Sequence, residues 1–366
     1  VLITGAGGFI GRNLATRLGT HKDLDLTLLD VDATDQQWQE ALSQAEVIFH
    51  LAGINRPKTE EEFETGNTGL TQQICATLRA LGRRPKIVMS SSIQASLANP
   101  YGRSKKAAEE ALIALGHETG APVSIHRLKN VFGKWCRPNY NSVTATFCHN
   151  IAHDLPISIS DPANAVDLVY VDDVVEAFLE ELAVPTSGQE GGYAPERIPS
   201  TRITLGELAG RIQAFHDMRG TLRVPDFSER FNQALYATYL SYVELAQQGY
   251  VLDIKRDPRG SLAEFIKSVH FGQIFVSRTV PGITRGNHYH HTKTEKFFVL
   301  EGEALIRIRP LDSQEVEEFH VRGEDYRVVD IPPGHTHSIT NTGDTEMVAL
   351  FWASEIFDPD RPDTYF

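Results

Sequence analysis

The sequence predicts an α/β domain built on a doubly wound parallel sheet, followed by an all-β domain that forms an antiparallel barrel or sandwich. Two patterns predict this order. The first half alternates short apolar runs with segments of helical spacing, and the last third carries short alternating segments separated by Gly, Pro, Asn and Asp. The length of 366 residues suits two domains. We place them at residues 1–249 and 250–366, because the pattern changes near residue 250.

The first half predicts βαβ units, because helix-length segments separate short buried strands. The predicted strands are Val1–Thr4, Leu26–Asp30, Val47–Leu51 and Lys86–Ser90, and the predicted helices include Thr68–Gly82 and Ser104–Gly116. Strand signals are fewer between about Pro138 and Gln248, and Pro and Gly cluster at Pro185–Pro199. This part predicts an irregular substrate lobe with helices such as Leu205–Met218.

The last third predicts antiparallel strands and no long helix. Its alternating segments include Phe297–Leu300, Ala304–Arg309 and Val328–Ile331. Six of the 14 histidines lie between residues 288 and 337, where even scatter would place about two. They are His288, His290, His291, His320, His335 and His337. We therefore expect the second domain to use imidazole groups.

The composition limits which partners the protein is expected to bind and in which cellular compartment it is expected to lie. The net charge of −13 argues against a broad surface that binds nucleic acid or an anionic membrane. No apolar run approaches the ~18 residues of a membrane span. No signal peptide is visible in the sequence given. The three cysteines lack CxxC spacing, which is typical of a reducing compartment. We expect a cytoplasmic protein with neither nucleic-acid binding nor membrane insertion.

The segment GAGGFIG (5–11) follows the first predicted strand and opens a helix. Glycines at this place let the backbone approach a pyrophosphate, whose charge the helix N-terminus favours. A glycine-rich turn without a ligand is the alternative. Asp30 ends the second strand, where a carboxylate can accept hydrogen bonds from an adenosine ribose. Because its carboxylate would repel a 2′-phosphate, Asp30 by itself favours NAD over NADP, and Arg12 can partly compensate this repulsion. The other interpretation is that Asp30 is a solvated residue at a strand end without a ligand.

A tyrosine and a lysine stand four residues apart in YGRSK (101–105), so they share one face of the predicted helix. An ammonium beside a phenol stabilises the phenolate and tunes Tyr101 as a proton donor or acceptor. Ser90-Ser91-Ser92 ends the preceding strand and can supply a hydroxyl that binds the reacting oxygen. This pattern predicts proton-transfer chemistry at the end of that strand.

The first ~245 residues resemble an extended short-chain dehydrogenase/reductase with a Rossmann-type fold, the group that works on nucleotide sugars. The segments that carry the resemblance are GAGGFIG (5–11), HLAG (50–53), GNTG around Asn67, SSS (90–92), YGRSK (101–105), RLKNVFG (127–133) and YVDDVV (170–175). The resemblance implies that Ser92, Tyr101 and Lys105 are catalytic. It implies cofactor contacts from Gly5, Gly8, Phe9, Ile10, Gly11, Asp30, Leu51, Ala52, Gly53, Tyr101 and Lys105. Only eight residues separate Ser92 from Tyr101, so the loop over the site is short and an open pocket is expected.

Three histidines and a glutamate form the second constellation: His288, His290, Glu295 and His337. In a strand the first two point to one side, Glu295 can arrive from the next strand of a hairpin, and His337 from a later strand. Such a set suits Zn²⁺ or another first-row divalent ion. Residues 252–366 resemble a cupin barrel, which implies that all four are metal ligands. Tyr326 stands where that family has a glycine, which questions the turn there.

Two other uses of these histidines stay open. A cupin barrel can keep its motif without metal, and the cupin-like sugar-nucleotide 3,5-epimerases use a histidine base, which would make His288 a base. The Glu295 and His337 matches favour metal.

The two domains together resemble the bifunctional capsular-polysaccharide enzymes on the path to UDP-N-acetyl-L-fucosamine. The segments GKWCRPNYNSVTATFC (133–148), NHYHHTKTEKF (287–297) and DPDRPDTYF (358–366) carry this resemblance. It implies that the cupin epimerises C3 of a UDP-2-acetamido-2,6-dideoxy-4-hexulose and that the reductase then reduces the C4 ketone with NADPH. Asn130 and Arg137 are the expected diphosphate contacts, although Arg137 can equally be a surface charge.

Three features of this interpretation stay open. The acidic Asp30 keeps NAD(H) as an alternative to NADP(H). If the metal is structural, the base lies among Tyr289, His291, Lys293 and His335. A homodimer is expected by resemblance. The alternative functions are a reductase with a non-catalytic dimerising cupin, a sugar-nucleotide 4-epimerase or 4,6-dehydratase, and a non-enzymatic sugar-nucleotide sensor. The presence of Tyr101 and Lys105 is evidence against the sensor.

Overall fold

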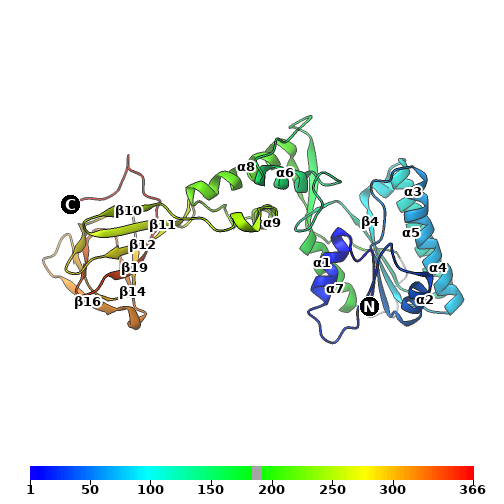
Figure 1. Ribbon diagram of the computed structural model, residues 1–366, viewed down its shortest axis with the longest axis horizontal. Helices are drawn as coiled ribbons and strands as arrows, with labels where there is room; N and C mark the ends of the chain where they lie inside the picture. Colours follow the sequence, from blue (N-terminus) through cyan, green and yellow to red (C-terminus); the bar gives the residue numbers. More distant parts are fainter. Residues whose placement is uncertain (184–191, 196) are drawn as a thin grey trace. The chain divides into compact units, whose positions relative to one another are not determined.

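The computed structural model describes residues 1–183, 192–195 and 197–366. These residues form two compact units, Val1–Ile212 with Ala237–Val243, and Gln213–Tyr236 with Glu244–Phe366. Figure 1 shows a sheet flanked by helices in the first unit and a strand-rich second unit. The domain division at residue 250 stays a prediction. Much of the Pro- and Gly-rich segment 185–199 lies outside the described residues.

A six-stranded parallel sheet forms the frame of the first unit, with the order β2-β1-β3-β4-β5-β8. The chain starts in the interior of the sheet and adds strands on both sides, which is the doubly wound arrangement that the sequence predicts. Each of the four predicted strands is found within two residues of its predicted ends. The strands are β1 (Leu2–Thr4), β2 (Thr27–Leu29), β3 (Val47–His50), β4 (Lys86–Ser92), β5 (Val123–Leu128) and β8 (Gly192–Tyr193).

Helices cover both faces of this sheet, and each face has its own apolar core (Figure 1). One core joins the sheet to α2, α4 and α5, and the other joins it to α1 and α7. The helices are α1 (Phe9–Leu18), α2 (Asp35–Gln44), α3 (Glu61–Phe63), α4 (Leu70–Leu81), α5 (Pro100–Thr119) and α7 (Val171–Ala183), with a π-helix, η1, at Glu64–Gly69.

Both predicted helices are present. The helix predicted at Thr68–Gly82 is α4, which begins within two residues of Thr68 and is preceded by helical turns from Glu61. The helix predicted from Ser104 begins four residues earlier, at Pro100, and this difference has a local cause. The side chain of Asn99 accepts a hydrogen bond from the Gly102 N–H and caps the first turn, where a proline is well tolerated.

The lobe predicted as irregular contains a small sheet of its own, in the order β6-β7-β9. Its elements are β6 (Asn130–Phe132), α6 (Val143–Ala152), β7 (Ala165–Tyr170), β9 (Thr201–Thr204), α8 (Leu205–Thr221) and α9 (Arg230–Leu240). None of the described helices has an apolar stretch long enough to cross a bilayer.

The second unit contains two antiparallel sheets, ordered β10-β11-β12-β19-β14-β17 and β13-β18-β15-β16, which confirms the predicted all-β fold. Side chains from both sheets, such as Phe297, Ile306 and Ile339, share one core, as in a cupin-like barrel. The strands are β10 (Ile254–Asp257), β11 (Gly260–Ser268), β12 (Gly272–Thr279), β13 (Thr284–His288), β14 (Glu295–Glu301), β15 (Glu303–Pro310), β16 (Glu317–Arg322), β17 (Val328–Ile331), β18 (His335–Asn341) and β19 (Met347–Ala353).

Candidate active site and metal centre

The structure brings Ser92, Tyr101 and Lys105 together at one end of the parallel sheet. Ser92 closes β4, and the other two lie one turn apart on α5. The Ser92 side chain acts on the pKa of Tyr101, so the two hydroxyl groups lie close together. Lys105 is buried, and its Nζ donates to the carbonyl oxygen of Ser90 at 2.9 Å. A serine, a phenol and an ammonium therefore face one place, as the sequence pattern predicts.

Burial adjusts the acidity of this group. It raises the pKa of Tyr101, against the hydrogen bond with Ser92, so the phenol keeps a proton that it can donate. Burial also lowers the pKa of Lys105 to about 8, while the charge of Glu109 opposes that shift. Lys105 is therefore cationic at neutral pH and loses its charge in mildly alkaline solution.

A buried carboxylate, Glu109, lies one further turn along α5 and was missed by the sequence reasoning. It accepts hydrogen bonds from Ser91, from Arg127 at 2.6 and 3.0 Å, and from the Tyr193 hydroxyl at 3.1 Å. These bonds tie α5 to the ends of β4 and β5. The signal was present, because Glu109 repeats the four-residue spacing of Tyr101 and Lys105 on one helix face.

The connection between Ser92 and Tyr101 is a single 3₁₀ turn, η2 (Ile93–Ser96), packed on the start of α5. A side chain at position 102 would collide with the carbonyl oxygens of Gln94 and Leu97, so glycine is required in YGRSK for this close approach. The short connection thus has a compact structure of its own.

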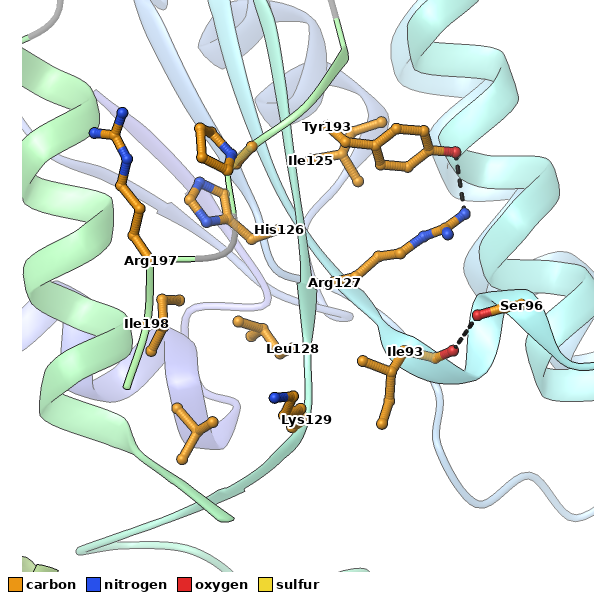
Figure 2. Close-up of a pocket in the computed structure, with 13 residues that line it drawn as sticks. Ile93, Ser96, Ile125, His126, Arg127, Leu128, Lys129, Tyr193, Arg197 and Ile198 are labelled. Atoms are coloured by element: carbon orange, nitrogen blue, oxygen red, sulfur yellow. Dashed lines mark hydrogen bonds between the residues drawn. The ribbon is translucent and has the colours of Figure 1, made fainter. Parts of the chain in front are cut away.

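A pocket of about 310 Å³ opens beside this turn. Figure 2 shows its wall, with Ile93 on one side, Arg127 and Lys129 at the end of β5, and Arg197 opposite. Arg197 has no ion-pair partner among the residues that the structure describes. The pocket combines apolar walls with cationic groups next to the strand that carries Ser92.

The two predicted diphosphate contacts lie apart from this pocket. Asn130 is exposed and donates to the carbonyl oxygen of Asp167 at 3.2 Å. Arg137 is exposed and stacks on the ring of Tyr140, 5.2 Å from its centre. Neither residue lines the pocket, and their role as substrate contacts stays a prediction.

The predicted cofactor residues gather at the carboxyl end of the same sheet. Gly5, in a left-handed conformation at φ +68°, lies against the backbone of Ala52, where a Cβ would come within 2.7 Å. The Asp30 carboxylate accepts the N–H of Gly7 at 2.6 Å. A Cβ on Gly53 would lie 3.7 Å from the Lys105 Nζ. The first three strand ends therefore form a continuous edge that leads to α5, which carries Tyr101 and Lys105. The remaining predicted contacts are Gly8, Phe9, Ile10, Gly11 and Leu51, at the start of α1 and the end of β3.

His50, beside these residues, is buried and its ring is held by two hydroxyl groups. Its two ring nitrogens bond to the hydroxyls of Thr4 and Thr71, each at 2.8 Å. Burial, and then the charge of Lys105, lower the pKa of His50 to about 3, so the ring is neutral.

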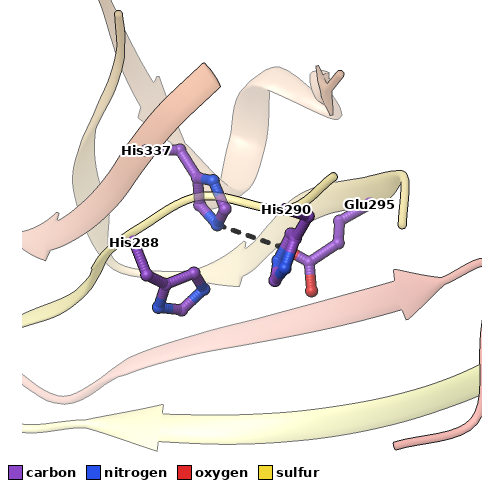
Figure 3. A group of neighbouring side chains, drawn as sticks. All are labelled: His288, His290, Glu295 and His337. Atoms are coloured by element: carbon purple, nitrogen blue, oxygen red, sulfur yellow. Dashed lines mark ion pairs between the residues drawn. The ribbon is translucent and has the colours of Figure 1, made fainter. Parts of the chain in front are cut away.

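The second unit brings His288, His290, Glu295 and His337 together, with one potential ligand atom from each within 4.8 Å of the others (Figure 3). His288 ends β13, His290 lies in the following loop, and His337 lies on β18 opposite His288. Glu295 begins β14.

These four residues suit a divalent cation. The Nε2 atoms of His290 and His337 are buried without a hydrogen-bond partner among the described residues, and lie 3.4 and 3.2 Å from Glu295 Oε2. Burial raises the pKa of Glu295, but the two imidazoles outweigh burial and lower it to about 2. Burial lowers the pKa of His288 to about 4, so this ring is neutral. A carboxylate and neutral imidazoles are the forms that bind Zn²⁺.

Two details of this site differ from the prediction. Glu295 was expected from the next strand of a hairpin, but β13 and β14 belong to different sheets, so Glu295 arrives from the facing sheet. His290 lies beyond the end of β13 and not within a strand. The turn questioned at Tyr326 does form, with Tyr326 left-handed at φ +48° and 81% exposed. Its ring lies 6.3 Å from that of Phe298 on β14.

The fold and the sites define the class: a nucleotide-binding domain of the epimerase and dehydratase type, followed by a sugar-biosynthesis β domain. Residues 1–193 match the model of the NAD dependent epimerase/dehydratase family, and residues 255–365 match the model called Polysaccharide biosynthesis C-terminal domain. The chain belongs to the NAD dependent epimerase/dehydratase family.

Relatives that span the whole chain specify the class further. The UDP-2-acetamido-2,6-beta-L-arabino-hexul-4-ose reductase of Pseudomonas aeruginosa is 42% identical over 365 residues, covering 100% of this chain and 97% of the relative. The crystal structure of the capsular polysaccharide assembling protein CapF from Staphylococcus aureus is 42% identical with a TM-score of 0.91, covering 100% of this chain and 98% of that chain. The resemblance to a two-domain enzyme is thereby confirmed at the level of family and fold.

More distant structures agree on the fold alone. The UDP-glucuronic acid 4-epimerase from Bacillus cereus in complex with NAD is 17% identical, with a TM-score of 0.57 over 68% of this chain and 98% of that chain.

Proposed function

We propose that this protein is a bifunctional nucleotide-sugar enzyme. The second unit epimerises C3 of a UDP-2-acetamido-2,6-dideoxy-4-hexulose, and the first unit reduces the C4 ketone of the product with NADPH. The observation that carries the proposal is the presence of two complete sites in one chain, a Ser-Tyr-Lys group and a His₃Glu group. The reductase relative, matched over the whole chain, supports the substrate class. The product would enter capsular polysaccharide synthesis on the path to UDP-N-acetyl-L-fucosamine.

The reduction needs a proton at the carbonyl oxygen when hydride reaches C4. Ser92 orients that oxygen by hydrogen bonding, and Tyr101 donates its phenolic proton. Lys105 compensates the negative charge that remains on the phenolate and holds the nicotinamide ribose. The pocket beside Ile93, with Lys129 and Arg197, supplies the apolar and cationic wall that a UDP-sugar needs.

The epimerisation needs removal and return of the C3 proton, which the neighbouring C4 ketone acidifies. A divalent cation held by His288, His290, Glu295 and His337 would supply positive charge for the enolate oxygen. The base stays open among Tyr289, His291, Lys293 and His335. Reduction in the first unit then makes the reversible epimerisation effectively irreversible.

The cofactor preference is tested at Asp30. The Asp30 carboxylate is already engaged by the N–H groups of Gly7 and Val31 at 2.6 and 2.8 Å. Arg12 stacks on Trp135 at 4.4 Å beside the glycine loop and offers a cation for a 2′-phosphate. We expect NADPH to be preferred. A strong wild-type preference for NADH that Asp30→Ala turns toward NADPH would overturn this choice, and the measurement is hydride transfer with both cofactors.

The decisive experiment is incubation with the 4-keto UDP-sugar and NADPH in D₂O, followed by NMR of the product. We expect one deuterium at C3 and one equivalent of NADPH oxidised. His337→Ala and a chelator should each slow deuterium entry at least about 100-fold, in the range of acid–base contributions. His320→Ala, which removes an exposed imidazole from the same barrel, is the matched control. Absence of deuterium at C3 under every condition would refute the epimerisation.

A reductase with a non-catalytic dimerising barrel is the second candidate. The first strands of the second unit support it, because Ile254, Phe265 and Val269 expose large apolar side chains there. This alternative predicts that His337→Ala changes neither the deuterium content nor the stereochemistry of the product. A 4-epimerase or dehydratase would form product without net NADPH consumption. A homodimer in the cytoplasm fits either of the first two functions.

A further inference from the structure

The last residues of the chain, 358–366, lie against the loop that carries the histidine ligands; we call this segment the C-terminal tail. We propose that the tail determines the metal affinity of the second unit by orienting His290 as a ligand. The inference rests on the metal centre of the proposed function, and it assigns Asp363 as a positioning residue.

The first contact fixes the tautomer of His290. Its Nδ1 is hydrogen-bonded to the backbone carbonyl oxygen of Asp363. A carbonyl oxygen only accepts, so Nδ1 must carry the proton, and Nε2 presents a lone pair to the other three ligands. Nε2 is the buried atom without a hydrogen-bond partner among the described residues. The carbonyl of Asp363 therefore prepares the ring for a cation.

The side chain of the same residue holds the backbone of the loop. The Asp363 carboxylate accepts the N–H groups of His291, Thr292 and Lys293 at 2.9, 3.0 and 3.0 Å, and the Thr292 hydroxyl at 3.1 Å. Asp363 is left-handed at φ +40°, which lets its carbonyl and its carboxylate both reach this loop. One residue thus orients the ligand and fixes the three residues after it.

Residues on both sides of Asp363 add two further attachments. Tyr289 and Tyr365 exchange backbone hydrogen bonds of 2.8 and 3.0 Å, and their rings stack at 5.4 Å. The buried Lys293 donates to the carbonyl oxygen of Pro362 at 3.1 Å. Tyr289 stands between His288, the last residue of β13, and His290 in the loop, so this pairing continues the strand past His288.

The tail is separated from the ligand loop by some seventy residues in sequence, and its contacts concentrate on that loop. A segment needed only to complete the apolar core would bury large side chains. Instead Tyr365 and Phe366 are 45% and 95% exposed, and the attachments are hydrogen bonds to the loop. This arrangement is expected of a support for the metal ligands, whose loss typically weakens metal binding 10–100-fold.

The test measures Zn²⁺ and Co²⁺ affinity of the full protein by competition with a chelating dye, together with the visible spectrum of the Co²⁺ form. Four variants are compared: deletion of residues 363–366, Asp363→Ala, Asp363→Asn and Asp360→Ala. The first removes the acceptor for His290. The second removes only the carboxylate, and the third keeps an acceptor oxygen. The fourth removes an exposed carboxylate of the same tail and is the matched control.

We expect the four-residue deletion to weaken metal binding at least about 10-fold and to alter the Co²⁺ spectrum. Asp363→Ala should have a smaller effect in the same direction, and Asp363→Asn should restore most of the affinity. Asp360→Ala should leave the metal affinity within twofold of the wild type. If the four-residue deletion does not fold, as judged by unfolding of the metal-free protein, the comparison of Asp363→Ala with Asp363→Asn tests the role of the tail.

Two results overturn the inference and can be told apart. If the wild-type protein binds metal and both the deletion and Asp363→Ala bind it equally well, the role of the tail is wrong and the metal centre stands. If the wild-type protein binds neither metal, the proposed metal centre fails and the inference fails with it.

Discussion

The phenol of Tyr101 is the candidate proton donor of the reductase site, and the Ser92 side chain acts on its pKa. Tyr101→Phe removes that proton while keeping the ring. We expect kcat for ketone reduction to fall by about 10²–10⁴, the usual contribution of a positioned acid, with little change in cofactor binding. Single-turnover oxidation of NADPH measures the effect. Tyr326→Phe, at an exposed tyrosine, is the control, and equal losses in both variants would contradict the role.

Lys105 gives the reduction a dependence on pH. Its pKa is lowered to about 8 by burial, against the opposing charge of Glu109. The charged form is the functional one, so kcat/KM for the reduction should be level below pH 8 and fall as the pH rises through that value. The titratable groups that interact with the charge of Lys105 are His50 and Glu109, and the pKa of His50, at about 3, lies far below this pH range.

The variant that checks this assignment is Lys105→Arg, which keeps the positive charge at alkaline pH. Its profile should lack the fall near pH 8, even if its maximal rate is lower. A wild-type profile that stays level to pH 10 would contradict the prediction.

A buried cluster of ionic groups links helix α7 to the parallel sheet. Glu181 on α7 lies 2.7 Å from Lys86 Nζ on β4 and 3.1 Å from His126 Nε2 on β5, and Lys86 is 1% exposed. Glu181→Gln would leave the buried ammonium without its counter-charge. We expect a loss of about 3 kcal/mol in the free energy of unfolding, measured with urea. Glu180→Gln, at the exposed neighbouring position, should change it by less than about 0.5 kcal/mol.

The same cluster predicts acid sensitivity. Burial raises the pKa of Glu181, but bonds from His126, Lys86 and Ser124 outweigh it and lower the pKa to about 2 from 4.5. A carboxylate with a depressed pKa stabilises the fold fully above its ordinary value and loses that contribution as the pH falls toward 2. Unfolding measured between pH 5 and 2 should therefore be steeper in the wild type than in Glu181→Gln, and parallel curves would contradict the assignment.

For the whole molecule, the two units allow metal binding to be followed separately from the nucleotide domain. Of the three tryptophans, Trp352 belongs to the second unit, where its Nε1 donates to the Phe271 carbonyl at 2.6 Å. In a variant with Trp38→Phe and Trp135→Phe, fluorescence reports the second unit alone. Zn²⁺ at about 1,000 times its Kd should stabilise that unit by about 4 kcal/mol. An unchanged unfolding midpoint would contradict a metal centre in the native barrel.

Much of the site could be predicted from the sequence because its signals are local. The four-residue spacing of Tyr101 and Lys105 places both on one helix face, and a serine at a strand end is found by counting. The parallel arrangement of the strands also follows from the alternation of strand and helix signals along the first half of the sequence. Glu109 was missed because it is one of several charged residues on a helix, and only its bonds to Arg127 and Tyr193 distinguish it.

The sequence by itself determined the two domain types, the carboxyl-edge position of the glycine loop and the identity of the histidine cluster, since each depends on residue types at short, regular spacing. Tertiary structure decided the rest. Glu295 reaches the histidines from the facing sheet, and Asp363 reaches them from the end of the chain. Both contacts join segments that are separated in the sequence by no regular spacing, so a sequence pattern cannot predict them. Only the closure of the barrel brings the carboxylate and the tail to the imidazoles.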